Sequence, residues 1–199
     1  MSAPQTLTQI AGAPLTPSPL ASSALLVIDL QDEYQSGALK LDQLDRALGE
    51  TKKLLDLARA SGMPIFHFQH KTGPGAPIFD PTGPFFGLID AVKPMAGETV
   101  IEKNFPNCFT ATGLAEQLKA TGRSEVIIAG AMTHMCISAT ARSATDHGYR
   151  ATVVADACAT RPLPGALGGT IPASQVHETA LAEIADGFNV VVKNADAWK

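Results

Sequence analysis

Six apolar segments alternate with amphipathic segments along this chain, and this alternation restricts the fold more than any other feature. The apolar segments have the length of β-strands and span residues 24–30, 64–70, 99–103, 125–131, 151–157 and 188–194. The segments between them favour helices, each ends at a glycine, and they span residues 41–62, 111–122, 136–148 and 174–187. Strands that alternate with helices form parallel sheets with right-handed crossovers. We therefore predict a three-layer α/β/α fold around a mainly parallel, doubly wound sheet of six strands.

Two connecting segments depart from this pattern because proline and glycine are concentrated in them. They span residues 70–97 and 160–173. Long loops in compact domains are usually functional, so we expect these two to form a lid or a pocket wall. The first 22 residues also lack the alternation. We predict an N-terminal arm over residues 1–22, lying on the surface, and a single domain over residues 23–199.

Composition and charge exclude several classes of protein. Hydrophobic residues make up 45% of the 199 residues, which is sufficient for a substantial core. The net charge of −4, without blocks of like charge, argues against nucleic acids and membranes as partners. No apolar run approaches the ~18–20 residues of a membrane span, and the N-terminus lacks the basic residues of a signal peptide. Three cysteines without a CxxC pair argue against a disulfide framework, so we predict a cytoplasmic protein.

Three reactive side chains stand where predicted strands end. Asp29 lies near the end of the first strand, Lys103 ends the third, and Cys136 follows the fourth. Ligands of doubly wound sheets bind at the carboxyl ends of the strands, so we expect these residues to converge. An acid, an amine and a thiol from separate elements form a candidate nucleophilic set.

Four stretches around these residues resemble the isochorismatase-like cysteine hydrolases, a superfamily that includes nicotinamidases and related amidases. They read ALLVIDLQDEY from residue 24, VIEKNFPNCFTATGL from residue 100, VIIAGAMTHMCISATARSA from residue 126 and VVADACAT from residue 153. Their order and spacing match the family, so the resemblance implies an isochorismatase-like hydrolase domain over residues 23–199. It also implies that Asp29, Lys103 and Cys136 form the catalytic triad and that the Ala131–Met132 peptide bond is cis.

The resemblance further implies a substrate class and a pocket. The substrate would be a small molecule whose amide C–N bond is cleaved through a thioester intermediate. The backbone N–H groups of Met132 and Cys136 are the expected oxyanion donors. The residues expected in the substrate pocket are Gln31, Tyr34, His70, Phe105, His134 and Met135, although His134 also fits the role of an ordinary turn residue.

Elementary chemistry agrees with these roles. The thiolate is the attacking species, and a free cysteine has a pKa of about 8.5. Cys136 is expected at the start of a helix, where the helix dipole favours negative charge, and Lys103 adds a nearby positive charge. Asp29 is expected to accept the thiol proton and later to deliver it to the leaving amine.

No metal or other cofactor is expected. Nicotinamidases carry a metal site built from an Asp and several His after the second strand, and the Asp-x-His pattern is missing here. His67 and His70 are three residues apart, which on a strand points them to opposite faces. His177 is expected on the surface of its helix, and the remaining two cysteines, Cys108 and Cys158, are expected to be structural.

Two alternatives to an amidase stay open. An isochorismatase-type enzyme would hydrolyse a vinyl ether, but that branch usually lacks the cysteine, so Cys136 weighs against it. A non-catalytic relative would use the fold for binding, with Cys136 as an oxidisable sensor, and the complete triad disfavours this. The resemblance and the uncommitted N-terminal arm also predict a homo-oligomer, either a dimer or a tetramer.

Overall fold

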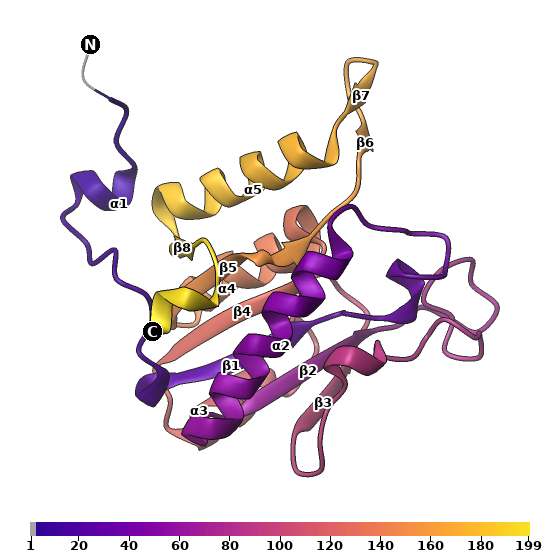
Figure 1. Ribbon diagram of the computed structural model, residues 1–199, viewed down its shortest axis with the longest axis horizontal. Coiled ribbons are helices and arrows are strands. Elements are labelled where there is room, and N and C mark those ends of the chain that lie inside the picture. Colours follow the sequence, from indigo (N-terminus) through magenta and orange to yellow (C-terminus); the bar gives the residue numbers. More distant parts are fainter. Residues whose placement is uncertain (1–2) are drawn as a thin grey trace.

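The computed structural model describes residues 3–199 and contains a central sheet of six parallel strands (Figure 1). The strands are arranged in the order β3-β2-β1-β4-β5-β8, and every neighbouring pair is parallel. Their bounds are β1 (Ser23–Ile28), β2 (Ile65–His70), β3 (Thr99–Lys103), β4 (Glu125–Ala131), β5 (Arg150–Ala159) and β8 (Val190–Val192). The predicted doubly wound α/β fold is confirmed.

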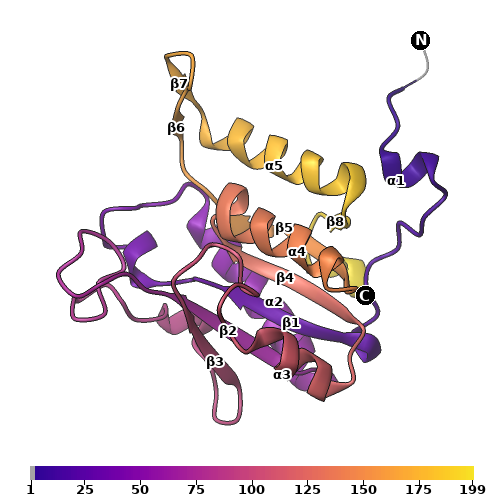
Figure 2. The same ribbon diagram turned by 180° about the vertical axis from the view of Figure 1, so that it is seen from behind.

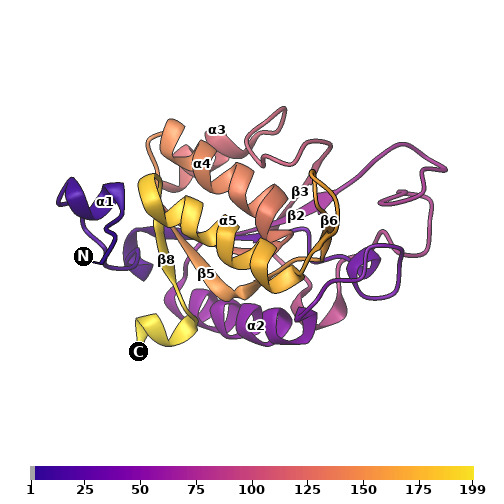
Figure 3. The ribbon, with the colours of Figure 1, turned by 90° about the horizontal axis from the view of Figure 1, so that it is seen from above.

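Helices cover both faces of the sheet. Helix α2 (Leu44–Ser61) lies on one face (Figure 1), and α3 (Leu114–Thr121) and α4 (Ser138–Asp146) lie on the other (Figure 2). Helix α5 (Ala173–Gly187) runs beside α4 near the β8 edge (Figure 3), and its Leu181 and Ile184 join the same apolar cluster as α4.

The strands are apolar throughout because both of their faces are buried. In β1, Leu26 and Ile28 belong to the apolar cluster under α3 and α4, whereas Leu25 and Val27 belong to the cluster under α2. Successive side chains of a strand point to opposite faces, so a sheet covered on both sides requires a continuous apolar run.

Helix α2 begins at Leu44, three residues later than predicted. The N–H of Asp42 donates to the carbonyl of Thr160 at 2.8 Å, and Gln43 has the left-handed φ of 57°. These two residues therefore belong to a loop that contacts the end of β5. The helix ends as predicted, at Gly62, whose left-handed φ of 64° suits glycine.

Strand β8 is shorter than the predicted segment 188–194. Asn189 is buried before it, and its side chain accepts a hydrogen bond from the N–H of Ala151 and donates one to the carbonyl of Ala141. Asn189 thus holds the segment between α5 and β8 against β5 and α4. The short β8 pairs with Thr152–Val154 and leaves the second half of β5 beyond its reach.

The N-terminal arm contacts the rest of its own chain. The N–H of Leu7 donates to Asp186 Oδ1 at 3.0 Å, and the indole of Trp198 donates to the carbonyl of Ser18 at 2.8 Å. Within residues 3–199, no helix is both long and apolar enough to cross a membrane.

The remaining elements are short. They are α1 (Leu7–Ile10), β6 (Leu163–Pro164) and β7 (Thr170–Ile171), the 3-10 helices η1 (Leu20–Ser22), η2 (Asp32–Tyr34), η3 (Asp90–Val92) and η5 (Ala195–Trp198), and the π-helical turn η4 (Thr133–Ile137).

Candidate active site

The topology places two of the expected site residues side by side. Strands β1 and β4 are neighbours, but the chain continues from β1 to β2 on one side and from β4 to β5 on the other. The carboxyl ends of such a strand pair form the crevice where ligands bind in doubly wound sheets. Asp29 directly follows β1, and Cys136 lies in η4, directly after β4.

Lys103 reaches the same point from the edge of the sheet. It is the last residue of β3, and it pairs with His70 of β2. Because β3 lies two strands from β1, at roughly 4.8 Å per strand, only a long side chain can cover that distance. Lys103 Nζ lies 2.6 Å from Asp29 Oδ2 and 3.4 Å from Cys136 Sγ. The structure therefore brings all three expected triad residues together.

Lys103 and Asp29 form a fully buried ion pair. Burial by itself lowers the pKa of Lys103, but the Asp29 carboxylate and the nearby thiols raise it above its ordinary value, so the ammonium keeps its charge. The Asp29 Oδ1 atom is also buried, and it has no hydrogen-bond partner. Asp29 therefore offers an unoccupied oxygen to a proton from a group nearby.

Cys136 rests as a neutral thiol. Burial is the first cause that raises its pKa, to about 12, the Asp29 carboxylate is the second, and Lys103 acts in the opposite direction. Lys103 lowers the pKa of Cys136, as expected, but burial and the Asp29 carboxylate outweigh it, so the thiol and not the thiolate is the resting form. The physical reason is that the charge of Lys103 is already paired with Asp29, which leaves burial as the dominant effect.

The backbone around the site is unusual at three points. Asp29 has a left-handed φ of 53°, which Asp tolerates better than most residues. Gly130 has a φ of 129°, and a Cβ at this position would overlap the carbonyl of Ile28, so β4 and β1 approach closely only with glycine here. The Ala131–Met132 bond is cis, and the carbonyl of Met132 accepts hydrogen bonds from the N–H groups of Met135 and Ile137, which shape the turn around Cys136.

His70 forms one wall of the site. Lys103 Nζ lies 3.1 Å from His70 Nδ1, and an ammonium can only donate, so the ring proton must sit on Nε2. Burial and then Lys103 lower the pKa of His70, which makes the neutral ring the resting form. The ring packs edge-on against Phe79 at 5.0 Å, and the buried ring of Tyr34 packs against the same phenylalanine at 5.4 Å. The loop from residue 71 to 98 thus packs, through Phe79, against a side chain that contacts Lys103.

Gln31 does not face open space. Its side-chain amide donates to the carbonyls of His70 and Phe86, and its oxygen accepts from the N–H of His70 at 2.8 Å. Placing Gln31 among the substrate contacts is therefore wrong for this structure, because every polar group of the amide already binds backbone. Gln31 instead anchors the long loop to β2.

The rim of the site carries the other expected pocket residues and one that sequence reasoning missed. Phe105 and Met135 are half-exposed, and the Nδ1 atom of His134 lies 2.6 Å from Thr160 Oγ1. Arg161 follows Thr160, its Nε is buried without a hydrogen bond, and no carboxylate within residues 3–199 forms an ion pair with it. Burial and then the charge of Arg161 lower the pKa of His134. Arg161 lies two residues after the end of β5, and a position just after a strand of the sheet is the sequence signal that indicates it.

The residues of the site do not fit a metal ion as they stand. Asp29, His70 and Cys136 each present one ligand atom, and these atoms lie within 4.8 Å of one another. The ammonium of Lys103 contacts all three, so it occupies the place where a divalent cation would bind. His67 lies elsewhere, on the opposite face of β2, with its Nε2 at 2.9 Å from Glu98 Oε2.

His177 also differs from the sequence-based expectation. It is half-buried rather than on the helix surface, and its Nδ1 lies 2.9 Å from Oγ1 of Thr133 at the start of η4. The apolar spacing of α5 could not show this contact, because the partner lies on an element 44 residues away.

Known proteins resemble this chain over nearly its whole length. The family description "Isochorismatase domain" matches residues 23–196. The crystal structure of an isochorismatase from Pseudomonas putida is 43% identical, covers 98% of this chain and 99% of its own, and has a TM-score of 0.92. A secreted isochorismatase effector of Verticillium dahliae is 35% identical over 93% of this chain and 95% of its own length. A streptothricin hydrolase of Streptomyces noursei is 35% identical over 86% of this chain, which spans 63% of that protein.

Proposed function

This chain belongs to the isochorismatase family of hydrolases, and from that premise we propose that it cleaves the amide C–N bond of a small molecule through a cysteine thioester. One observation carries the proposal: the buried ammonium of Lys103 contacts both Asp29 and Cys136. The names of relatives support the reaction type, since one is a streptothricin hydrolase and another, 31% identical, is a maleamate amidohydrolase of Pseudomonas putida.

In the first half of the proposed reaction, Cys136 attacks the substrate carbonyl while Asp29 takes the thiol proton. Attack and proton transfer must occur together, because a free thiolate is scarce when the pKa of Cys136 is about 12. The new S–C bond creates an oxyanion, and the N–H groups of Met132 and Cys136 are the proposed donors to it. The C–N bond then breaks, and Asp29 returns the proton to the leaving amine.

In the second half, water resolves the thioester. Asp29, again a carboxylate, takes a proton from water as the oxygen attacks the carbonyl carbon. The C–S bond breaks, the acid leaves, and the proton passes from Asp29 to the sulfur. Lys103 stays charged throughout and holds the carboxylate beside the sulfur, so the resting site is restored without any other reactant.

The polar groups of the rim support a substrate with a carboxylate or another strong acceptor. Arg161 has no carboxylate partner within residues 3–199, and the Nε2–H of the neutral His70 ring is a hydrogen-bond donor beside the triad. A small amide that also carries an anionic group would be suited to these donors. Arg161→Gln should therefore raise KM for such a substrate by about ten- to 100-fold, with kcat changed far less.

The test is to capture the intermediate. A panel of small amides, each with a free carboxylate or as its methyl ester, is mixed with the protein and quenched in acid. For at least one of the amides with a free carboxylate, mass spectrometry of the peptide around Cys136 should show the added acyl group. Cys136→Ser should abolish this adduct. Cys158→Ala is the matched control, because that thiol is buried outside the triad. Turnover without an adduct, or turnover that survives Cys136→Ser, would contradict the thioester route.

We also propose that the protein works in a reducing compartment, the cytoplasm, as a homo-oligomer acting on a small molecule. All three cysteines are free and buried, as suits such a compartment. Exposed apolar side chains on the N-terminal arm, Leu7, Ile10 and Leu15, support contact with a second copy.

A further inference from the structure

His177 ties helix α5 to the turn that carries the proposed nucleophile. Its Nδ1 lies 2.9 Å from Oγ1 of Thr133, a fully buried residue three positions before Cys136. Thr133 donates its single hydroxyl proton to the carbonyl of Ala159 at 3.2 Å, so His177 must donate from Nδ1. Burial and then Arg46 lower the pKa of His177, so the neutral ring is the resting form. The Thr133 hydroxyl thus links β5, α5 and the first residue of η4.

The first residue of η4, Thr133, begins the turn that carries Cys136. The turn winds around the carbonyl of Met132, which accepts hydrogen bonds from Met135 and Ile137. Thr133 is the next residue after Met132, and Cys136 lies between the two donors in sequence. A shift of Thr133 therefore moves the sulfur and the proposed oxyanion donors together.

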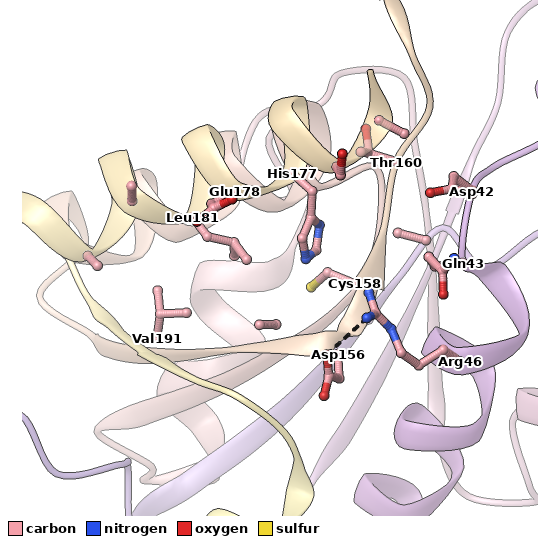
Figure 4. A pocket seen from close by; sticks show the side chains of 16 residues that line it. Asp42, Gln43, Arg46, Asp156, Cys158, Thr160, His177, Glu178, Leu181 and Val191 are labelled. Atoms are coloured by element: carbon pink, nitrogen blue, oxygen red, sulfur yellow. Dashed lines mark ion pairs between the residues drawn. The ribbon is translucent and has the colours of Figure 1, made fainter. Parts of the chain in front are cut away.

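His177 also lines a cavity of about 750 Å³ (Figure 4). It is bounded by α5, by the second half of β5 and by the start of α2, and the imidazole of His177 points into it toward Cys158. The exposed residues Asp42, Arg46 and Glu178 line its mouth. A molecule as small as imidazole can therefore enter from solvent and reach the position of the His177 ring.

We propose that His177 is a positioning residue, which holds the turn η4 in place through its hydrogen bond to Thr133. We further propose that, when the His177 side chain is removed, a free imidazole can bind in the cavity and make the same hydrogen bond. The inference rests on the proposed function, since it assigns His177 to the same site. His177 touches no reacting atom. It acts by holding Thr133 against β5, so that Cys136 stays beside Asp29 and Lys103.

The first experiment compares three substitutions of His177 with His147→Ala as the matched control. His147 ends α4 and stacks on Phe109 at 4.4 Å, far along the helix from the turn. His177→Ala should lower kcat by about ten- to 100-fold, as a misplaced nucleophile does, with KM within about threefold of the parent. His177→Asn should recover most of this loss, because its amide donates from a position close to that of Nδ1. His177→Gln, whose amide reaches the Nε2 position, should not.

The second experiment adds imidazole to His177→Ala. It should restore kcat in a saturable way, and it should fail in the double variant T133V/H177A, which lacks the acceptor oxygen. Alkylation of Cys136 by iodoacetamide gives a readout that needs no substrate. The loosened turn should make alkylation several-fold faster in His177→Ala, and imidazole should slow it again. If no amide is hydrolysed by the parent, the proposed function fails while this readout still decides the role of His177.

Two results would overturn the inference. One is that His177→Ala matches the parent in both kcat and alkylation rate, which would mean that the hydrogen bond positions nothing. The other is a loss in His177→Ala that neither His177→Asn nor imidazole restores, which would mean that the substitution disturbs packing in general.

Discussion

Asp29→Asn is expected to speed the alkylation of Cys136 and to slow amide hydrolysis. The substitution removes a buried negative charge with little change of shape, and asparagine tolerates the left-handed φ of 53° at this position. The Asp29 carboxylate is, after burial, the second cause of the raised pKa of Cys136, and Lys103 acts against it. Without Asp29 the pKa of Cys136 therefore falls, so the thiol becomes easier to ionise while the proposed proton acceptor is lost.

The magnitudes make the two effects easy to separate. With a pKa of about 12, only about one thiol in 10⁴ is ionised near pH 8. Each unit by which the pKa of Cys136 falls gives about ten times more thiolate. A less basic thiolate is also a weaker nucleophile, so the net alkylation rate should rise by about threefold per unit. Amide hydrolysis should instead fall by about 10²–10⁴, the usual contribution of a general acid and base.

The assay measures both quantities on the folded protein. Iodoacetamide alkylation of Cys136 is followed by peptide mass mapping, with the fully buried Cys108 and Cys158 as internal reporters of unfolding. Single-turnover hydrolysis of an amide that the parent accepts is measured beside it. Lys103→Met is the control of opposite sign, because loss of its charge should raise the pKa of Cys136 and slow alkylation. Alkylation no faster than in the parent, or hydrolysis within about threefold of it, would refute the role given to Asp29.

Three further predictions concern the ion pair, metals and assembly. Asp29→Asn and Lys103→Met each leave one buried charge unpaired, so each should lower the free energy of unfolding by about 3–5 kcal/mol in urea titrations. The double variant should lose clearly less than the sum, and additive losses would show that the two charges do not interact. Hydrolysis should survive EDTA, with no stoichiometric zinc, iron or manganese by elemental analysis; activity that only added metal restores would show that an ion displaces Lys103. Light scattering should report a multiple of 20.7 kDa at micromolar concentration, and a monomer would reject the proposed oligomer.

The order and kind of the elements follow from local patterns in the sequence. The run from Ala24 to Ile28 is apolar at every position, which suits only a strand with both faces covered, and the structure buries its alternate residues in two different clusters. The glycine after α2 ends the helix for a purely local reason, its left-handed φ. The position of the site also follows, because Asp29 and Cys136 stand where adjacent parallel strands end.

The properties of the site depend on contacts between distant segments, and only the tertiary structure decides them. Lys103 meets Asp29 because the two side chains together span the distance from β3 to β1, across β2, and with this charge paired, burial leaves Cys136 a neutral thiol. The amide of Gln31 is hydrogen-bonded to backbone carbonyls of β2 and of the long loop, whereas His177 reaches Thr133 from another helix. Local patterns specify which face of an element is apolar. Burial, side-chain direction and charge pairing are set by residues far away in the chain, so pKa values and hydrogen-bond partners emerge only when the fold brings those residues together.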